Sequence, residues 1–236
     1  MRLIYKEHKG ILYKKYEFPY CVYAIKEQTD LYVDLYSKGF LPYSNDFSID
    51  EEIYYLARSV RIDLQQETLF NYKQKNVLNK LGKLFPEEEI TISLLNKEQF
   101  IDDPIFARWC LVYAKDHFLT EERLNYILSR PYMKQIMKVQ HGDRIVAFLF
   151  PIIEGPDMFH IWFNFYDTTI HENDFGKWIL LQTIQYAKQA GFKHYYIGTC
   201  YGRSAFYKLT LSPHTSYFNG ETWDLNVDKL KKSILP

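Results

Sequence analysis

The chain has 236 residues and a mass of 28.4 kDa, enough for one large hydrophobic core or two small ones. A hydrophobic content of 47% is typical of a globular protein and excludes a largely disordered chain. With 29 basic and 29 acidic residues the formal net charge is zero, so binding of a nucleic acid would need a local basic face. We interpret the 18% of aromatic residues mainly as core, with base stacking as the alternative.

The three cysteines, Cys21, Cys110 and Cys200, are far apart and form no Cys-x-x-Cys pair. This pattern indicates neither a disulfide framework nor a structural zinc site, and it favours a reducing, cytoplasmic compartment. The histidines have no His-x-x-x-His spacing, so no metal site is predicted. No apolar run approaches ~18 residues and the first residues contain no apolar signal segment, so neither a membrane span nor export is expected.

Residues 1–86 are predicted to form a small β-rich portion. Runs of β-branched and aromatic residues predict its strands, and apolar residues at helical spacing predict two helices, of which the second is basic. In chain order these elements are strands over 3–6, 11–16 and 20–25, a helix over 29–37, a long strand over 52–64 and a helix over 73–83.

Residues 87–236 are predicted to form an α/β domain that begins after a turn at Pro86. Asp103 and Pro104 interrupt its first helix, Thr120 begins the next, and Gly191 ends the longest one. The predicted elements are a strand over 90–95, a helix over 97–118, a helix from 120, a hairpin of 134–140 with 144–150, a strand over 158–165, a helix over 175–189, a strand over 193–197, a short helix over 203–209 and a strand or hairpin over 216–225.

The stretch 159–208 carries the most informative pattern in the chain. Its landmarks, in order, are a strand that ends at Phe165, Tyr166 and Asp167, a helix opened by Gly176, a second strand, and the pair Tyr207 and Lys208. This order resembles the acyl-transfer core of the GNAT superfamily, in which two strands separate and a helix N-terminus faces the cleft. The resemblance implies an α/β (α+β) fold with a GNAT-like mixed sheet flanked by helices, and acyl transfer as the reaction class.

Two longer blocks together resemble the arginyl-tRNA–protein transferases and their bacterial leucyl-tRNA relatives. The first block is Arg-Ser-Val-Arg-Ile-Asp-Leu over 58–64 with a basic stretch over 72–80. The second combines Asn-Phe-Tyr-Asp, Asp-Phe-Gly-Lys, Tyr-Tyr-Ile-Gly and Tyr-Lys, which begin at 164, 174, 195 and 207. The resemblance runs from about residue 32 to 223.

This family resemblance implies an enzyme that moves an amino acid from charged tRNA to the N-terminal α-amine of a protein destined for degradation. Arginine is the first expectation for the donor and leucine the second. The aminoacyl-tRNA is itself the donor substrate, so no cofactor is expected. We expect the protein to be a monomer that does not contact membranes.

The chain departs from the family pattern in three places. The family commonly has a cysteine cluster that binds a metal or an iron-sulfur centre, whereas residues 43–47 here read Tyr-Ser-Asn-Asp-Phe. Thr168 replaces a usual proline, and several arginines of the basic stretch are replaced by Asn76, Val77 and Asn79. We therefore expect no metal regulation, and the donor specificity and the affinity for tRNA stay open.

An aminoacyl ester is already activated, so its transfer to an α-amine mainly requires the two reactants to be held in line. The α-amine has a pKa of about 7.7–8.0, so roughly 10–20% is neutral near pH 7 and a strong general base is not needed. Backbone N–H groups where the 158–165 strand separates are expected to stabilise the oxyanion. Asp167 is expected to bind an ammonium group or accept a proton, against the alternative of capping the turn after the strand.

The hydroxyls of Tyr166 and Tyr207 are expected to hydrogen-bond the ester or the ribose, against the alternative that both rings only line the cleft. The expected catalytic residues are therefore Asp167, Tyr166 and Tyr207. The expected substrate-binding residues are Asn164, Phe165, Gly176, Arg61, Arg203 and Lys208. Among these, Arg61 and Arg203 are the candidates for reading the carboxylate of an acidic acceptor.

Residues 58–83 contain six basic residues and two acidic ones, which predicts a local basic face. Such a face suits the phosphates of a tRNA acceptor stem, and a solvated helix face is the alternative. The expected tRNA-binding residues are Arg58, Lys73, Lys75, Lys80 and Lys83.

Two other functions stay open. Acyl-CoA-dependent GNAT enzymes usually hold pyrophosphate in a glycine-rich loop at a helix N-terminus. The stretch 171–178 has one glycine, two acids and a tryptophan, so an acyl-CoA-dependent N-acyltransferase ranks second. A non-catalytic relative that binds tRNA or protein N-termini ranks third. Cys200 has no histidine predicted beside it, so a nucleophilic role is not expected.

Overall fold

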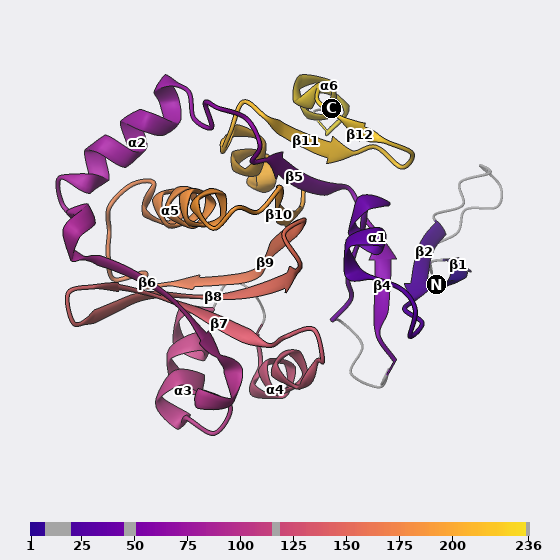
Figure 1. The fold of residues 1–236 in the computed structure, drawn as a ribbon, viewed down its shortest axis with the longest axis horizontal. Helices are drawn as coiled ribbons and strands as arrows, with labels where there is room; N and C mark the ends of the chain where they lie inside the picture. Colours follow the sequence, from indigo (N-terminus) through magenta and orange to yellow (C-terminus); the bar gives the residue numbers. More distant parts are fainter. Residues whose placement is uncertain (8–19, 45–50, 115–118, 235–236) are drawn as a thin grey trace.

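The computed structural model describes residues 1–7, 20–44, 51–114 and 119–234. Over these residues the chain forms a four-stranded and an eight-stranded sheet, with helices on both faces of the larger one (Figure 1). In the larger sheet β9 and β10 run parallel, and the other neighbouring strands are antiparallel. The predicted α/β class, with a mixed sheet flanked by helices, is confirmed.

The small sheet lies beside one end of the large sheet and has the order β1-β2-β4-β3 (Figure 1). Its elements are β1 (Arg2–Glu7), β2 (Tyr20–Ile25), α1 (Tyr32–Ser37), β3 (Phe40–Pro42) and β4 (Ile53–Leu56). The strands predicted over 3–6 and 20–25 are confirmed, and the helix predicted over 29–37 begins three residues later. The strand predicted over 11–16 lies outside the described residues.

The strand predicted over 52–64 is two strands in different sheets. β4 ends at Leu56, and β5 (Ser59–Asp63) pairs with β10 and β11 in the large sheet. The carbonyl of Gly39 fixes the crossing, because it accepts hydrogen bonds from the Ala57 N–H at 3.2 Å and from Ser59 Oγ at 2.7 Å. β5 thus belongs to the large sheet although it precedes residue 87, and the domain boundary between 86 and 87 stays a prediction.

The large sheet has the order β12-β11-β5-β10-β9-β8-β7-β6. Besides β5, its strands are β6 (Ile90–Asn96), β7 (Gln135–His141), β8 (Arg144–Glu154), β9 (Met158–Tyr166), β10 (His194–Thr199), β11 (Thr215–Phe218) and β12 (Trp223–Asp224). The predicted hairpin is β7 with β8, and the predicted C-terminal hairpin is β11 with β12. The strand order places β9 and β10 at the centre of the sheet.

The longer helices lie on both faces of the large sheet (Figure 1). They are α2 (Tyr72–Gly82) with α5 (Phe175–Gln189) on one face, and α3 (Pro104–Tyr113) with α4 (Glu121–Ser129) on the other. The single helix predicted over 97–118 is a short turn, η3 (Lys97–Gln99), followed by α3. The Asp103 side chain caps α3 by accepting a hydrogen bond from the Ile105 N–H at 2.9 Å, so the helix begins there.

The remaining helical segments are η2 (Glu87–Glu89), η5 (Arg203–Thr210) and α6 (Val227–Ile234). η5 corresponds to the predicted short helix over 203–209, and α6 has no counterpart among the predictions.

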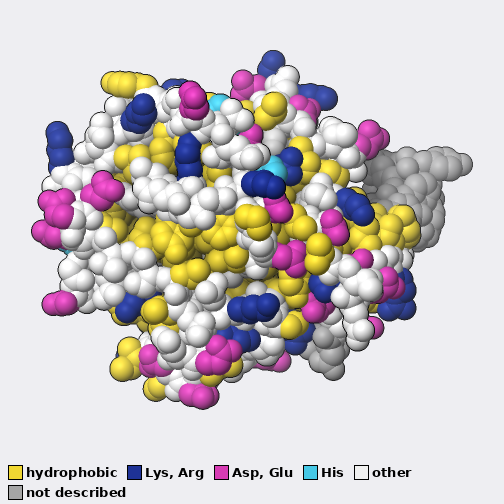
Figure 2. All heavy atoms as spheres, in the orientation of Figure 1, with side chains coloured by type: hydrophobic (Ala, Val, Ile, Leu, Met, Phe, Trp, Pro, Cys, Tyr) yellow, Lys and Arg dark blue, Asp and Glu magenta, His cyan; other side chains and the backbone are white. Residues whose placement is uncertain are grey.

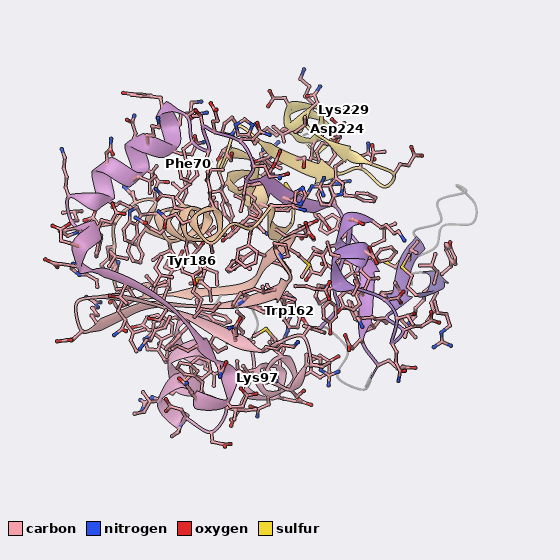
Figure 3. The ribbon with its side chains drawn as sticks, viewed as in Figure 1. Phe70, Lys97, Trp162, Tyr186, Asp224 and Lys229 are labelled. Atoms are coloured by element: carbon pink, nitrogen blue, oxygen red, sulfur yellow. The ribbon has the colours of Figure 1, made fainter. Side chains whose placement is uncertain are left out.

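Two hydrophobic cores lie on the two faces of the large sheet. One contains Trp178, Leu181 and Ile184 of α5 and extends to Phe70, which lies just before α2 and is labelled in Figure 3. The other joins α3 and α4 to α1 through residues such as Phe106 and Tyr36. Figure 2 shows hydrophobic side chains gathered across the middle of the molecule, between the two layers of helices. Each central strand therefore contributes alternate side chains to two separate cores.

Candidate functional site

The two central parallel strands separate partway along their length. β10 pairs with β9 from His194 to Tyr196, opposite Met158 to His160, and no further pair of the two strands follows. β9 has one extra residue relative to β8, since Phe150 pairs with Phe163 and Pro151 with Ile161. β10 has a matching irregularity against β5 between Tyr196 and Thr199, where Gly198 has a φ of 77°. These two bulges bend the strands apart, and the left-handed backbone of the second favours glycine.

A cavity of about 880 Å³ fills the space between the separated strands. Its walls are the second half of β9, the loop over 168–174, the first turns of α5, the end of β10 and the middle of η5. A volume of this size is within the range of small-molecule and cofactor sites. Five residues predicted from the sequence line this cavity together, and they are Asn164, Tyr166, Gly176, Tyr207 and Lys208.

Gly176 and Tyr166 bring the N-terminus of α5 close to the end of β9. An ideal Cβ on Gly176 would lie 2.7 Å from the Tyr166 ring, so only glycine lets the ring take this place. Asp174 begins α5 with a φ of 68°, and its side chain caps no N–H group of the first turn. The first turn of α5 therefore presents a positive partial charge at the cavity wall.

Lys208 lies at the apex of the cavity, where the two strands separate. Its Nζ donates a hydrogen bond to the Thr199 carbonyl at 3.0 Å, and a Cβ on Gly198 would lie 3.4 Å from this nitrogen. Burial lowers the pKa of Lys208 to about 8, although the nearby Cys200 thiol opposes this shift. A lysine in this state is a weak acid at neutral pH and exchanges its proton more readily than an exposed lysine.

His160, the last residue of β9 that pairs with β10, is buried close to the charge of Lys208. Its Nδ1 is 2.7 Å from the Tyr36 hydroxyl, and its Nε2 has no hydrogen-bond partner among the described residues. Burial first, and the charge of Lys208 second, lower the pKa of His160 to about 3, so the imidazole is neutral at physiological pH. The imidazole therefore links α1 to the apex of the cavity without adding a charge.

Two further polar side chains, Asn164 and Tyr207, line the wall of the cavity. The Oδ1 of Asn164 is buried, and no described residue donates a hydrogen bond to it. The Tyr207 side chain lies on η5 and is 44% exposed, so its ring is accessible from the cavity mouth. Burial, followed by the nearby Tyr166 and Cys200, raises the pKa of Tyr207, which keeps its hydroxyl protonated. Both groups are available to a polar ligand.

Arg123 of α4 also lines the cavity and was missed in the sequence. One of its Nη atoms donates to Ser44 Oγ at 3.1 Å, and its guanidinium carbon lies 5.7 Å from the centre of the Phe163 ring. Trp162, labelled in Figure 3, lines the same part of the wall, with its ring 5.3 Å from that of Tyr132. Because α4 packs on the opposite face from α5, the gap between β9 and β10 is lined from both faces of the sheet.

Asp167, expected to be catalytic, lies away from the cavity wall and is only 3% exposed. Its carboxylate accepts hydrogen bonds from Arg144 Nε at 3.2 Å, from the Thr169 N–H at 2.9 Å and from Thr169 Oγ1 at 2.6 Å. Burial alone would raise the pKa of Asp167, but the hydrogen bonds from Thr169 and Arg144 outweigh it and lower the pKa. These contacts are those of a turn cap, the alternative considered for this residue.

Four more expected residues are also absent from the cavity wall. Phe165 is fully buried among the rings of the α3 and α4 core, 5.1 Å from that of Phe150. Arg61 lies over the Trp223 ring at 4.1 Å and donates to the Tyr196 hydroxyl at 3.4 Å. Arg58 lies over the Tyr201 ring at 5.6 Å. Arg203 is exposed at the start of η5. Neither Arg61 nor Arg203 is therefore placed to bind the carboxylate of an acceptor residue inside the cavity.

The four expected tRNA-binding lysines are exposed along α2, which packs against α5. Lys75 shares a second hollow with Lys188 and Gln189 at the C-terminal end of α5. At the other end, the Phe85 ring follows α2 and lies 5.2 Å from that of Phe175. Lys80 and Lys83 are thus near the cavity end of α5, whereas Lys73 and Lys75 are near its far end, about 20 Å away at 1.5 Å per residue.

No group of three or more His, Cys, Asp or Glu side chains among the described residues is placed to hold a metal ion. None of the helices in the same part of the chain is long and apolar enough to cross a membrane.

Residues 104–217, which include every residue that lines the cavity, match the family described as arginine-tRNA-protein transferase, C terminus. No curated protein matches the chain. Among solved structures, the C-terminal domain of a protein described as a lysylphosphatidylglycerol synthetase from Agrobacterium fabrum has 14% identity and a TM-score of 0.43. The structure of L-PGS from Bacillus licheniformis has 15% identity and a TM-score of 0.45. In both cases the match covers 61% of this chain and 46% of the other.

Proposed function

Because the chain belongs, over residues 104–217, to the arginine-tRNA-protein transferase C-terminal family, we propose that it moves an amino acid from a charged tRNA to the N-terminal α-amine of an acceptor protein. Use of an aminoacyl-tRNA follows from the family, and the donor, the acceptor and a role in protein degradation are parts of the proposal. The observation that carries the proposal is the cavity between β9 and β10, with Lys208 at its apex and the N-terminus of α5 in its wall.

The edge of β9 that faces this cavity supports transfer from an ester. Pairing with β10 ends at His160, so the backbone over 161–166 faces the cavity on that edge and not another strand. Backbone N–H groups held in this way suit a developing oxyanion, because they need no rearrangement during the reaction. We place the ester carbonyl against this edge, next to Asn164 and Tyr166.

The two sides of the gap suit different reactants. On the α5 side, the exposed carboxylates of Glu172 and Asp174 lie just before the helix and favour the ammonium group of the aminoacyl donor. On the α4 side, Arg123, Trp162 and Phe163 offer one cation within an aromatic wall, which suits the first residue of an acceptor protein. We therefore propose that Arg123 binds the side-chain carboxylate of an acidic first residue, the role that the sequence suggested for Arg61 and Arg203.

The loop before α5 argues against an acyl-CoA donor. Glu172 and Asp174 line the cavity at the position where a pyrophosphate would approach the helix. Two carboxylates would repel a pyrophosphate there, and the loop over 168–174 contains no glycine that would let the backbone come close. An aminoacyl donor places an ammonium group in this region, and the acidic side chains are compatible with it.

The proposal is tested by offering the purified protein a mixed pool of charged tRNAs together with peptides that begin with Asp, Glu, Lys or Arg. A parallel reaction contains acetyl-CoA in place of the tRNA. We expect the mass of one arginyl or leucyl group on a subset of the peptides, which would identify the donor and the acceptor together. An acetyl mass would favour the acyl-CoA function, and no product in either reaction would favour a binding protein.

A further inference from the structure

Lys208 is a largely buried cation without an acidic partner. It takes part in none of the ion pairs among the described residues, and its Nζ donates a hydrogen bond to the Thr199 carbonyl. A protein interior disfavours such a group, because burial of an ammonium costs free energy that a single carbonyl does not return. A charged group that is buried next to a cavity despite this cost is often part of a functional site.

The titratable side chains closest to Lys208 are uncharged at neutral pH, so they do not neutralise its ammonium. His160, on β9, is neutral at physiological pH. Burial raises the pKa of Cys200, just beyond β10, so this thiol carries no charge at neutral pH either. Apart from Lys208, the acidic and basic side chains of the cavity wall come from the α5 entrance and from α4, and they are His171, Glu172, Asp174, Lys177 and Arg123. The Nζ has three hydrogens, of which one is directed to Thr199, so the cavity side of the ammonium remains available.

We propose that Lys208 is the acid that protonates the ribose oxygen leaving the aminoacyl ester. This inference rests on the proposed function and assigns a catalytic residue within it. The acceptor nitrogen forms a bond to the ester carbonyl carbon, and the bond from that carbon to the ribose oxygen breaks. Lys208 gives a proton to the departing oxygen, and the new amide nitrogen releases one proton, which returns to the lysine amine directly or through solvent.

The step needs such an acid because an alkoxide is a much poorer leaving group than an alcohol. An ordinary lysine, with a pKa of about 10.4, is too weak an acid to help near neutral pH. Burial lowers the pKa of Lys208 to about 8, which brings it close to the working pH. The ammonium is present below this value and is lost as the pH rises through it. General acid catalysis by Lys208 should therefore decrease as the pH rises above its pKa.

The test compares Lys208→Met with the wild type on two donors, an aminoacyl-tRNA ester and an aminoacyl thioester. A thiolate leaves without protonation, so a missing acid harms the ester far more than the thioester. We expect kcat with the ester to fall about 100-fold, in line with general acid catalysis, and the loss with the thioester to be below about 10-fold. The falling limb of the pH profile above about 8 should also disappear in the variant.

Lys229→Met is the control, because Lys229 is an exposed lysine on α6 and is not part of the cavity wall. It should leave kcat and KM unchanged with both donors. Thermal unfolding checks that Lys208→Met is folded, and Lys208→Gln replaces it if it is not. Equal losses of Lys208→Met with the ester and the thioester, or no loss with either, would overturn the inference. A wild type that transfers nothing from charged tRNA overturns the proposed function itself.

Discussion

The ring of Tyr166 occupies the space that a side chain on Gly176 would need, since a Cβ there would lie 2.7 Å from the ring. This contact fixes the end of β9 against the first turn of α5. It also sets the width of the cavity at the place where we put the donor ester. A small change at Gly176 therefore tests whether this geometry matters for transfer.

We expect Gly176→Ala to reduce transfer at least 10-fold while the protein stays folded. The methyl group must displace either the Tyr166 ring or α5, and small misplacements of reacting groups are costly in rate. Gly82→Ala in α2 is the control, because no atom lies within 4 Å of its Cβ position. The control should keep full activity and gain up to about 1 kcal/mol of stability from helix propensity. Equal activity of the two variants would contradict this account of the cavity.

Asp167→Asn should destabilise the protein and leave the activity of the folded fraction nearly unchanged. The variant weakens the hydrogen bonds from Arg144 and Thr169, at a cost of about 1–3 kcal/mol. Since the folded-state pKa of Asp167 is lowered, its contribution is present above about pH 4 and is lost as the pH falls further. The difference between wild type and variant in denaturant unfolding should therefore shrink from pH 6 to pH 3.

The control for this variant is Asp174→Asn, because the Asp174 side chain makes no capping hydrogen bond and asparagine also tolerates its positive φ. It should leave the free energy of unfolding nearly unchanged. A folded Asp167→Asn protein that transfers nothing would instead return Asp167 to the catalytic mechanism.

Charge reversal on α2 should show which end of the helix faces the tRNA. We expect Lys80→Glu with Lys83→Glu to weaken tRNA binding at least 10-fold and to reduce the salt slope by about 1.5 to 2, as for two lost phosphate contacts. Lys73→Glu with Lys75→Glu, at the far end of α5, should have a much smaller effect. Fluorescence titrations of the two double variants over a range of salt concentrations make this comparison. A larger effect at Lys73 and Lys75 would place the acceptor stem beside the second hollow.

Arg123→Gln should remove a preference for peptides that begin with Asp or Glu. Losing a charge-assisted contact to a carboxylate costs about 10- to 100-fold in kcat/KM, and peptides without an acidic first residue should be affected little. Arg130→Gln is the matched control, because Arg130 follows the same helix but lies over the Tyr126 ring at 4.1 Å and not in the cavity wall. Unchanged selectivity in Arg123→Gln would assign the carboxylate to another residue.

The sequence was informative where function depends on the order of elements. The strand, helix, strand and short helix from β9 to η5 follow from hydrophobic period and turn residues, and they bring Tyr166, Gly176 and Lys208 to one cavity. The break between β4 and β5 was not predictable, because both halves are rich in strand-forming residues and a distant carbonyl, that of Gly39, fixes the crossing. Arg123 was missed for a similar reason, since its helix is brought to the cavity only by tertiary packing.

Asp167 shows a different limit of the sequence. Tyr166 and Asp167 are adjacent in an extended chain, so they point to opposite faces, and the sequence does not say which one faces α5. The extra residue near Trp162 in β9 reverses the faces of everything that follows it. A bulge of one residue thus decides that Tyr166 lines the cavity and that Asp167 supports the loop behind it.

The most direct test of the central claim is a single-turnover reaction of excess protein with purified arginyl-tRNA or leucyl-tRNA, with and without a peptide that begins with Asp. Loss of the aminoacyl group from the tRNA and gain of that group by the peptide are measured in the same samples. The account predicts that the two amounts are equal over time and that the tRNA stays charged without a peptide. Deacylation without peptide product, or no deacylation at all, would contradict transfer at this site.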